Sequence, residues 1–312
     1  MNDNLLWVER YRPTKVADTI LPAKLKKTFQ TFVDDGFVPN LILAGEPGTG
    51  KTTVAKAVCE ELGVQTYMVN GSLERNIDTL RTDIQQFASA KGRGGKRKMV
   101  IFDEADYLNV TSTQPALRNF LEEYSKNCGF IFTCNHKNRI IAPLHSRCSV
   151  VDFVFPRDEK PEMAKQLFLR LKHILDEEGV EYEDKAVVEL IKKFFPDMRK
   201  TIMEAQRRSS EGTINMEMVG AIGNVSIREL VGFMKNKDYT ETRRWIGANS
   251  DVETVQLLRG FYDEASDLFE ARSIPQLVLI LADYQHRAPF VADQEINLAA
   301  CMAEIMVNCE FK

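Results

Sequence analysis

Nine residues near the amino end constrain this chain more than any other stretch. They read Gly-Glu-Pro-Gly-Thr-Gly-Lys-Thr-Thr over 45–53, directly after an apolar run at 41–44 and directly before a helical pattern from Val54. Glycines let backbone N–H groups turn inward around phosphate oxygens, and a helix N-terminus adds partial positive charge. The pattern is typical of a strand–loop–helix that binds a nucleoside triphosphate. The candidate phosphate contacts are Gly48, Thr49, Gly50, Lys51, Thr52 and Thr53.

The overall composition bounds the remaining possibilities. At 312 residues the chain is long enough for two or three domains, and its net charge of −4 gives no general affinity for nucleic acid. The apolar runs are too short for a membrane span, and the first residues lack the features of a signal peptide, so we expect no membrane partner. The six cysteines form no C-x-x-C pair, which favours reduced, buried thiols in a cytoplasmic protein.

The order of apolar runs predicts an α/β fold. Strands are expected at 41–44, 65–70, 99–103, 130–135 and 150–153, with helices such as 78–90 and 114–124 between them. This alternation favours a parallel sheet with helices on both faces. Strand patterns stop after Pro156, so we predict a first domain over 1–155 and two all-helical domains over 156–222 and 223–312. The last helix is apolar on more than one face, which favours packing into a larger assembly.

Two acids, Asp103 and Glu104, follow the apolar strand at 99–102, about 50 residues after the phosphate loop. Asp103 is positioned to hold Mg²⁺ beside Thr52, and Glu104 to accept a proton from an attacking water. The letters Asp-Glu-Ala-Asp at 103–106 also occur in DEAD-box helicases, but those need a second nucleotide-binding lobe that the strand pattern does not provide. The segment Asn-His-Lys-Asn at 135–138 departs from the guanine motif N-K-x-D, so ATP is the expected nucleotide.

Two further polar residues are candidates because of where they stand. Asn135 ends the strand at 130–135 and would lie beside the acid-bearing strand, where it could orient water or contact the γ-phosphate. Arg147, in Ser-Arg-Cys at 146–148, could stabilise charge on a transferring phosphoryl group. Taken by itself, the pattern around Arg147 fits a surface ion pair at least as well.

The ordered set of motifs resembles the clamp-loader branch of the AAA+ ATPases, most closely its T-even-type phage members. The set comprises Val-Glu-Arg-Tyr-Arg-Pro at 8–13, the phosphate loop, the acids at 103–106, the strand ending in Asn135, and Ser-Arg-Cys at 146–148. Similar matches are Val-Asn-Gly-Ser at 69–72, Asn-Cys at 127–128 and Phe-Pro-Asp-Met-Arg-Lys-Thr at 195–201. The resemblance implies a P-loop ATPase core, a helical lid and a helical collar for oligomerisation.

The resemblance also implies roles for individual residues. Arg199 would reach the phosphates from the lid, and Arg147 would act in trans on ATP bound by an adjacent subunit. Asn70 would restrain the catalytic Glu104, and Gln114 would link DNA contacts to the acid-bearing strand; Pro115 departs from the family pattern there. The adenine and ribose would be covered by Val8, Glu9, Arg10, Tyr11 and Ile20. DNA phosphates would be contacted by Arg75, Asn76 and Thr111.

The expected function is therefore that of an ATPase motor subunit in a loader of DNA polymerase sliding clamps. Its cofactors would be ATP and Mg²⁺. Its partners would be copies of itself, a non-identical loader subunit, the sliding clamp and primer–template DNA. Two alternatives stay open: another AAA+ replication motor, such as a helicase loader, and an ATP-gated scaffold without turnover. A phage origin would place the protein in the host cytoplasm.

Overall fold

The computed structural model describes residues 6–73, 77–210, 212–216, 227–249 and 254–312. It divides the chain into two compact units, Met1–Val219 and Gly220–Lys312. Two of the predicted DNA contacts, Arg75 and Asn76, lie outside the described residues.

A five-stranded parallel sheet forms the centre of the first unit. Its strands follow the order β2-β3-β4-β1-β5. All seven residues of β4 are buried, because this strand lies between β3 and β1 and is covered on both faces. The predicted parallel α/β sheet is confirmed. The strand bounds are β1 Leu41–Ala44, β2 Thr66–Asn70, β3 Lys98–Asp103, β4 Cys128–Cys134 and β5 Ser149–Asp152.

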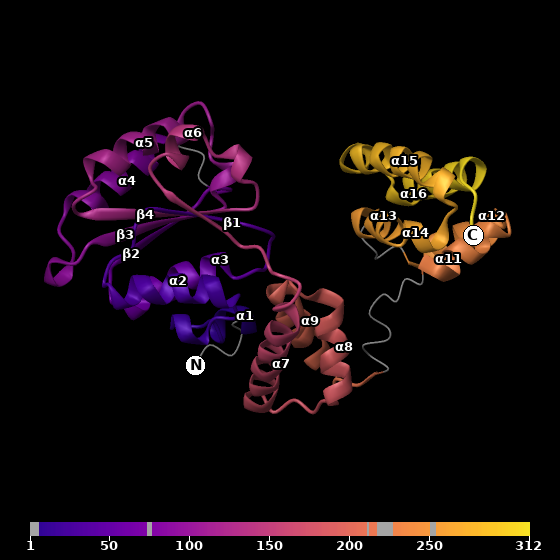
Figure 1. Cartoon of the computed structure of the whole chain (residues 1–312), viewed down its shortest axis with the longest axis horizontal. Coiled ribbons are helices and arrows are strands. Elements are labelled where there is room, and N and C mark those ends of the chain that lie inside the picture. Colours follow the sequence, from indigo (N-terminus) through magenta and orange to yellow (C-terminus); the bar gives the residue numbers. More distant parts are fainter. Residues whose placement is uncertain (1–5, 74–76, 211, 217–226, 250–253) are drawn as a thin grey trace. The chain divides into compact units, whose positions relative to one another are not determined.

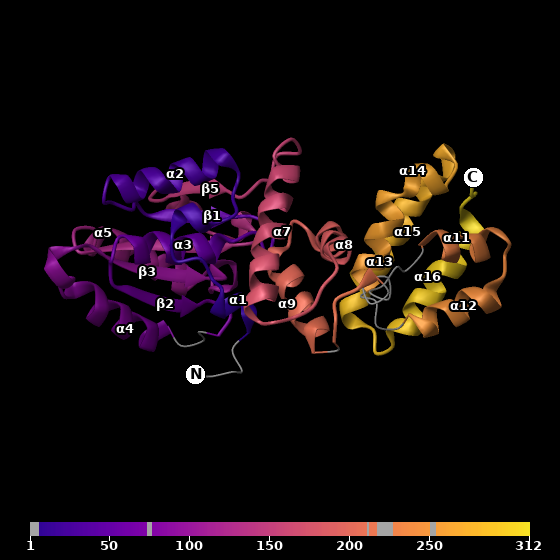
Figure 2. The same cartoon turned by 90° about the horizontal axis from the view of Figure 1, so that it is seen from below.

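Helices cover both faces of this sheet (Figure 1). One face carries α4 (Ile77–Ser89), α5 (Thr113–Glu123) and α6 (Ala142–His145), with a buried core that includes Phe102 and Phe132. The other face carries α2 (Ala23–Asp34) and α3 (Lys51–Glu61), which lie over the strands in Figure 2. Apolar side chains on both faces of β1 and β4 require such double coverage.

A small helical region completes the first unit. It contains α7 (Lys160–Glu177), α8 (Asp184–Phe194) and α9 (Met198–Ser209), and the short α1 (Trp7–Arg10) packs against α9. The buried face of α7 is formed by Met163, Leu167, Leu171, Ile174 and Leu175, at the helical spacing that the sequence displays. Asp197 caps α9 by accepting a hydrogen bond from the backbone N–H of Lys200 at 2.9 Å.

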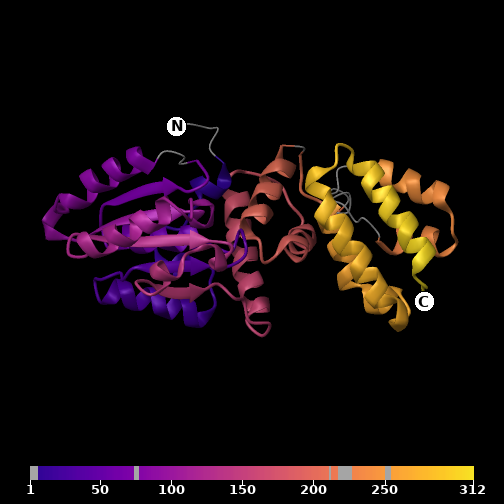
Figure 3. The same cartoon turned by 90° about the horizontal axis from the view of Figure 1, so that it is seen from above.

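The second unit is helical throughout its described part. Helices α15 and α16 lie side by side in it (Figure 3). Phe261, Phe269, Leu277 and Met302 are among the residues of its buried core. The helix bounds are α11 Ile227–Lys235, α12 Tyr239–Ala248, α13 Thr254–Asp263, α14 Ala265–Leu268, α15 Ile274–Arg287 and α16 Gln294–Asn308.

Two sequence expectations concern the whole chain. The six cysteines are free thiols, and five of them are buried. Within the described residues, no helix combines the length and apolar character that crossing a bilayer requires.

Candidate nucleotide site

The loop over 45–50 joins β1 to α3, and Lys51 is the first residue of α3. Gly48 and Gly50 adopt positive φ values of 72° and 90°, a conformation that glycine enters without steric cost. The Lys51 side chain is buried and folds back over the loop. Its Nζ donates to the carbonyl oxygens of Gly45 and Glu46 at 2.7 and 2.8 Å. Burial lowers the pKa of Lys51, and the nearby acids Asp103 and Asp106 oppose that shift only in part.

The acid pair stands at the carboxyl end of β3, next to the phosphate loop. Asp103 Oδ1 accepts two hydrogen bonds of 2.6 Å, one from the Thr52 hydroxyl and one from the Thr133 hydroxyl. The backbone N–H of Glu104 donates to the same Thr133 hydroxyl at 3.2 Å. Glu104 itself has a φ of 56°, a left-handed conformation that is uncommon outside glycine and frequent at functional sites. The Thr133 hydroxyl on β4 therefore orients the Asp103 carboxylate and holds the backbone of Glu104.

Asn135 follows β4 and reaches the same place. Its Oδ1 accepts a hydrogen bond of 3.0 Å from Lys51 Nζ. The predicted neighbourhood of strand ends is thus present. Three adjacent strands, β3, β4 and β1, lead to Asp103, Asn135 and the start of α3, and hydrogen bonds join Lys51 to Asn135 and Thr52 to Asp103.

These residues lie along one open cleft with an empty volume of about 1140 Å³, open solvent included. The cleft runs from the phosphate loop to the amino-terminal segment. Of the predicted nucleotide contacts, it is lined by Val8, Tyr11, Ile20, Gly48, Thr49, Gly50, Lys51, Thr52, Thr53 and Arg199, together with Asp103, Glu104 and Asn135.

The predicted contacts Glu9 and Arg10 do not line this cleft. Arg10 forms an ion pair of 2.8 Å with Glu178, and the carboxylate of Glu9 pairs with Arg12. Glu178 also accepts a hydrogen bond of 2.5 Å from the Tyr11 hydroxyl. Burial, together with this hydrogen bond to a carboxylate, raises the pKa of Tyr11 to about 12.

The lid region contacts the phosphate loop directly. The backbone N–H of Met198, the first residue of α9, donates to the carbonyl of Gly48 at 3.1 Å. A Cβ atom on Gly48 would lie 1.8 Å from Asp197 Oδ1 and 3.0 Å from Asp197 Cα. Only glycine permits this approach, which brings the start of α9, and Arg199 with it, to the cleft.

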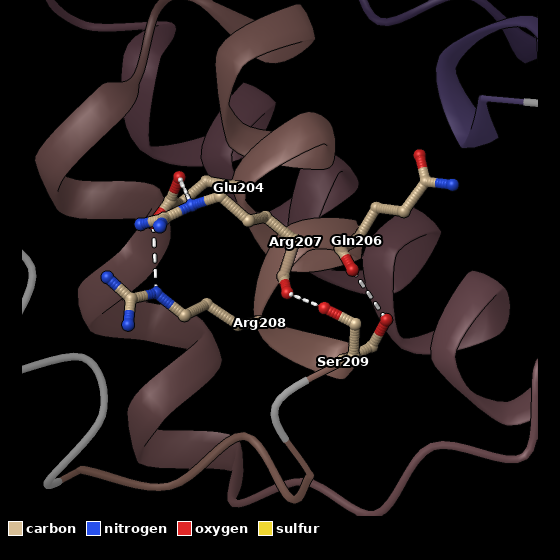
Figure 4. Close-up of polar contacts among 6 residues, drawn as sticks. Glu204, Gln206, Arg207, Arg208 and Ser209 are labelled. Atoms are coloured by element: carbon tan, nitrogen blue, oxygen red, sulfur yellow. Dashed lines mark hydrogen bonds and ion pairs between the residues drawn. The ribbon is translucent and has the colours of Figure 1, made fainter.

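The other end of α9 holds the amino-terminal segment. Gln206 accepts a hydrogen bond of 2.9 Å from the backbone N–H of Trp7. Figure 4 shows the Gln206 side chain extending away from the ion pairs that Glu204 forms with Arg207 and Arg208. Burial raises the pKa of Glu204, but the hydrogen bonds from both arginines outweigh it, so the pKa is lowered. Gln206 therefore lies on the side of α9 that meets α1, and Glu204 pairs with the arginines away from it.

Arg147 lies elsewhere on the first unit, just beyond α6. Its guanidinium forms an ion pair of 2.5 Å with Glu122 on α5 and donates to the carbonyl of Pro143 at 2.9 Å. It does not line the cleft formed by its own chain. Burial raises the pKa of the adjacent Cys148 thiol to about 12, so this cysteine is an unreactive neighbour.

The remaining predicted residues have identifiable contacts. Thr111 is exposed and bonds to Asn109 Oδ1, while Asn70 Oδ1 accepts from the backbone N–H and hydroxyl of Ser72. Gln114 is fully buried. Its amide donates to the carbonyls of Leu108 and Arg139, and its Oε1 accepts from the N–H of Ile141. It therefore connects the segment after β3 with the segment after β4.

Several residues that line or organise the cleft were not predicted. Thr133 is the one hydroxyl residue in an otherwise apolar run before Asn135. That isolated hydroxyl is the only sign in the sequence that the position contacts polar groups. Arg170 lies on α7, where it donates to the carbonyls of Tyr11 and Asp18 at 3.3 and 2.8 Å. A single arginine on the polar side of an amphipathic helix gives no signal for such a contact. The other unpredicted lining residues include Arg12, Pro13, Thr19, Leu21, Leu167 and Ile202.

The donor chemistry near Thr52 suits a magnesium ion. No group of three or more His, Cys, Asp or Glu side chains that could hold a metal occurs in the described part of the chain. Mg²⁺ in nucleotide sites needs less, because it keeps several waters and takes phosphate oxygens with one or two protein ligands. A hydroxyl and a carboxylate oxygen 2.6 Å apart fit that requirement.

Two family models match the first unit, one over the sheet and one over the helical region that follows it. Residues 41–155 match the ATPase family associated with various cellular activities (AAA). Residues 159–219 match the AAA+ ATPase lid domain of the sliding-clamp-loader large subunit.

Individual proteins give the same answer. The sliding-clamp-loader large subunit of Enterobacteria phage T4 is 35% identical over 97% of this chain and 96% of its own length. The protein of that name in Escherichia phage RB69 is 39% identical, covering 75% of each. The replication factor C small subunit of Methanosphaera stadtmanae is 31% identical over 96% of this chain and 97% of its own length.

Solved structures bear on the fold alone. The Thermotoga maritima RuvB Holliday junction branch migration motor aligns with a TM-score of 0.56 at 20% identity, over 72% of this chain and 79% of that one. The AAA+ fold and the family resemblance predicted from the sequence are thus confirmed. The chain belongs to the clamp-loader family of AAA+ ATPases and is a relative of the phage sliding-clamp-loader large subunits.

Proposed function

We propose that this protein is the ATP-driven motor subunit of a loader that opens a DNA polymerase sliding clamp and releases it at primer–template junctions. The observation that carries the proposal is the cleft in which Lys51, Thr52, Asp103, Glu104 and Asn135 converge, while Arg147 lies outside it. A chain with a nearly complete phosphate site and a separate arginine suits a machine whose sites are completed on assembly.

The residues in the cleft divide the chemistry among them. Lys51 turns from the loop carbonyls to the β- and γ-phosphates. Thr52 and Asp103 would hold Mg²⁺, which would supply positive charge to neutralise the phosphate oxygens. Glu104 accepts the proton of the attacking water. Asn135 and Arg199, which both line the cleft, contact the γ-phosphate. Val8, Tyr11 and Ile20 cover the base, and Glu9 and Arg10 support that segment from outside.

Arg147 acts on ATP held by a neighbouring copy of the chain. The transfer reaction develops charge on the γ-phosphoryl oxygens, and an arginine supplied in trans accelerates it by about 10³–10⁵-fold in related chemistry. Glu122 holds the guanidinium at the surface until a neighbour's phosphate replaces the carboxylate. Hydrolysis therefore depends on assembly.

The three segments of the chain have separate tasks in this proposal. Residues 1–155 form the ATPase core, 156–222 the lid, and 223–312 a collar that joins copies of the chain to one non-identical subunit. Exposed apolar side chains on α16 support a collar, since Ile296 is 68% and Val307 82% exposed and they lie three turns apart on one helix face.

DNA is contacted through its phosphates. Arg75 and Asn76 stand between β2 and α4 in the chain, and Thr111 follows β3 in the chain. Phosphate contacts carry no sequence information, which suits a loader that acts at any primed site. Gln114, which connects the segment after β3 with the segment after β4, transmits the contact to Glu104, which Asn70 restrains until DNA is bound. The phage relatives favour a place in the cytoplasm of an infected cell.

An omission experiment tests the proposal. Hydrolysis of ATP is measured for the full chain alone and with partner subunit, clamp and primed DNA, each left out in turn. We expect a steep rise only with all of them present. The Lys51→Ala variant should stay inactive throughout, whereas Lys56→Ala, on the same helix, should behave as wild type. A helicase loader would respond without the clamp, and a scaffold would show no turnover in the full mixture; either result would contradict the proposal.

A further inference from the structure

The third acid of Asp-Glu-Ala-Asp at 103–106, Asp106, has no role in the chemistry described so far. It lies in the short turn Ala105–Tyr107, its residue is 5% exposed, and its Oδ2 accepts two hydrogen bonds. The donors are the backbone N–H groups of Asn135 at 3.3 Å and His136 at 3.1 Å. These are the first two residues after β4, where the chain leaves the sheet beside the cleft.

The position of these two N–H groups explains why a carboxylate is needed. The ladder of β4 ends at Cys134, so the next donors have no strand partner, and a buried unpaired N–H costs about 1–3 kcal/mol. A carboxylate accepts both with one oxygen, and charge-assisted bonds of this kind are stronger than neutral ones. Asp106 therefore fixes the backbone at Asn135.

Asn135 is held at two independent points. Its backbone is bonded to Asp106, and its side-chain oxygen to Lys51 Nζ. The second contact is not assured once a triphosphate binds, because the three donors of the Lys51 ammonium are all in use and at least one must be released to bind phosphate. The first contact involves only the backbone and can persist. After nucleotide binding, Asp106 is what keeps Asn135 at the phosphate end of the cleft.

We infer that Asp106 is a positioning residue for ATP hydrolysis, which places the Asn135 carboxamide for the γ-phosphate by holding the backbone of Asn135 and His136. The inference rests on the proposed role of Asn135. Asp106 does not line the cleft, so it acts through Asn135 and not on the nucleotide.

The unused oxygen of the carboxylate makes a sharp variant possible. Asp106 Oδ1 is buried and accepts no hydrogen bond within the part of the chain that the structure describes. In Asp106→Asn, the amide oxygen can take the place of Oδ2 and the NH₂ group the place of Oδ1, so both backbone bonds survive without the charge. In Asp106→Ala, both bonds are lost. The pair separates the hydrogen-bonding role from the charge.

The chain also offers a matched control at the opposite end of the same strand. Asn40 Oδ1 accepts a hydrogen bond of 3.1 Å from the backbone N–H of Phe130 on β4. Asn40→Ala therefore removes a side-chain acceptor from a β4 N–H far along the strand from the cleft. A loss of activity that came only from a weakened sheet would occur in both variants.

The experiment measures single-turnover hydrolysis in the complex assembled from full chains, ATP affinity of the chain and thermal unfolding. We expect Asp106→Ala to slow hydrolysis by about 10- to 100-fold, the size of effect caused by small misplacements at reacting centres. ATP affinity should change by less than about threefold, roughly 0.6 kcal/mol. Asp106→Asn should recover most of the rate, and Asn40→Ala should keep it even where its unfolding temperature falls.

A double-mutant cycle provides the readout that a merely structural role would not move. If Asp106 acts through Asn135, the variant Asp106→Ala/Asn135→Ala should be no slower than Asn135→Ala alone. Additive losses would overturn the inference, as would a normal rate for Asp106→Ala or an equal loss in Asn40→Ala. Failure of the loader proposal is a separate result, because wild-type hydrolysis would then ignore clamp and DNA while the ratio of variant to wild type could still be measured.

Discussion

The hydroxyl of Thr52 donates a 2.6 Å hydrogen bond to Asp103 Oδ1, which joins the first turn of α3 to the end of β3. Both oxygens are ligands that Mg²⁺ accepts, and the neighbouring Thr133 already orients the carboxylate. The bond therefore aligns the proposed pair of metal ligands before nucleotide arrives.

Removing the Thr52 hydroxyl should weaken ATP binding only when Mg²⁺ is present. We expect Thr52→Ala to lower affinity about tenfold in magnesium, equivalent to roughly 1.4 kcal/mol, and to leave affinity unchanged in EDTA. Thr52→Ser retains a hydroxyl at the same position and is the control. Titration calorimetry in both media checks the prediction. Equal losses with and without magnesium would contradict a metal-binding role for Thr52.

Removing the Arg147 guanidinium should affect hydrolysis without affecting binding. We expect Arg147→Ala to bind ATP normally and to lose about 10³-fold in stimulated turnover of the assembled complex. Its stability should change by less than about 1 kcal/mol, because an ion pair with one exposed partner contributes little.

Glu122→Ala is the matched variant for Arg147, since it breaks the same ion pair and leaves the arginine in place. It should retain stimulated turnover. Normal turnover in Arg147→Ala, or an equal loss in both variants, would refute the assignment of Arg147 as a residue acting in trans.

Two glycines with nearly equal backbone conformation test the contact between the lid and the phosphate loop. Gly48 and Gly36 have φ values of 72° and 68°, but an added Cβ meets Asp197 at Gly48 and nothing within 4 Å at Gly36. Alanine at either position should cost about 1–2 kcal/mol of stability from the left-handed backbone. Only Gly48→Ala should also weaken ATP binding, because the start of α9 must move away. Affinities measured at matched stability decide between the two effects.

The lowered pKa of Lys51 predicts how ATP affinity varies with pH. Only the protonated amine attracts phosphate, and burial makes the free protein lose that proton at a lower pH than an ordinary lysine does. Affinity should therefore decline on the alkaline side before the usual lysine range is reached, and binding there should take up protons. Calorimetry in two buffers of different ionisation enthalpy measures that uptake. Affinity and proton count that stay constant through this range would contradict the prediction.

The sequence predicts the central sheet well because its signals are local. The run at 41–44 is β1 residue for residue, and the other strands begin and end within about two residues of their predicted limits. Each is a short apolar run bounded by polar or turn residues, so the covering helices change little in where it starts and stops. Asn135 could be placed beside the acid-bearing strand for the same reason, and the structure pairs β4 with β3.

The contacts between the amino-terminal segment and the helical region join residues far apart in the chain, and the sequence carries no local signal for them. Trp7 and Gln206 are 199 positions apart, and nothing in either neighbourhood indicates the other. Glu9 and Arg10 were predicted to contact the nucleotide, but neither lines the cleft. They stand between two residues that line the cleft, yet Arg10 turns outward because Glu178, on another helical segment, offers it a partner. Which side chains of a short helix face inward depends on how the helix is rotated about its axis. Tertiary contacts set that rotation, so the local sequence does not reveal it.

Helix α9 touches the cleft region at both ends, through Met198 at the phosphate loop and Gln206 at the amino-terminal segment. A helix is stiff over this length, so it cannot release one end without tilting about the other. We therefore expect the residence time of the nucleotide to depend on both contacts. Exchange of ADP for ATP would thus be set by how the lid swings, a property that selection can tune at residues remote from the chemistry.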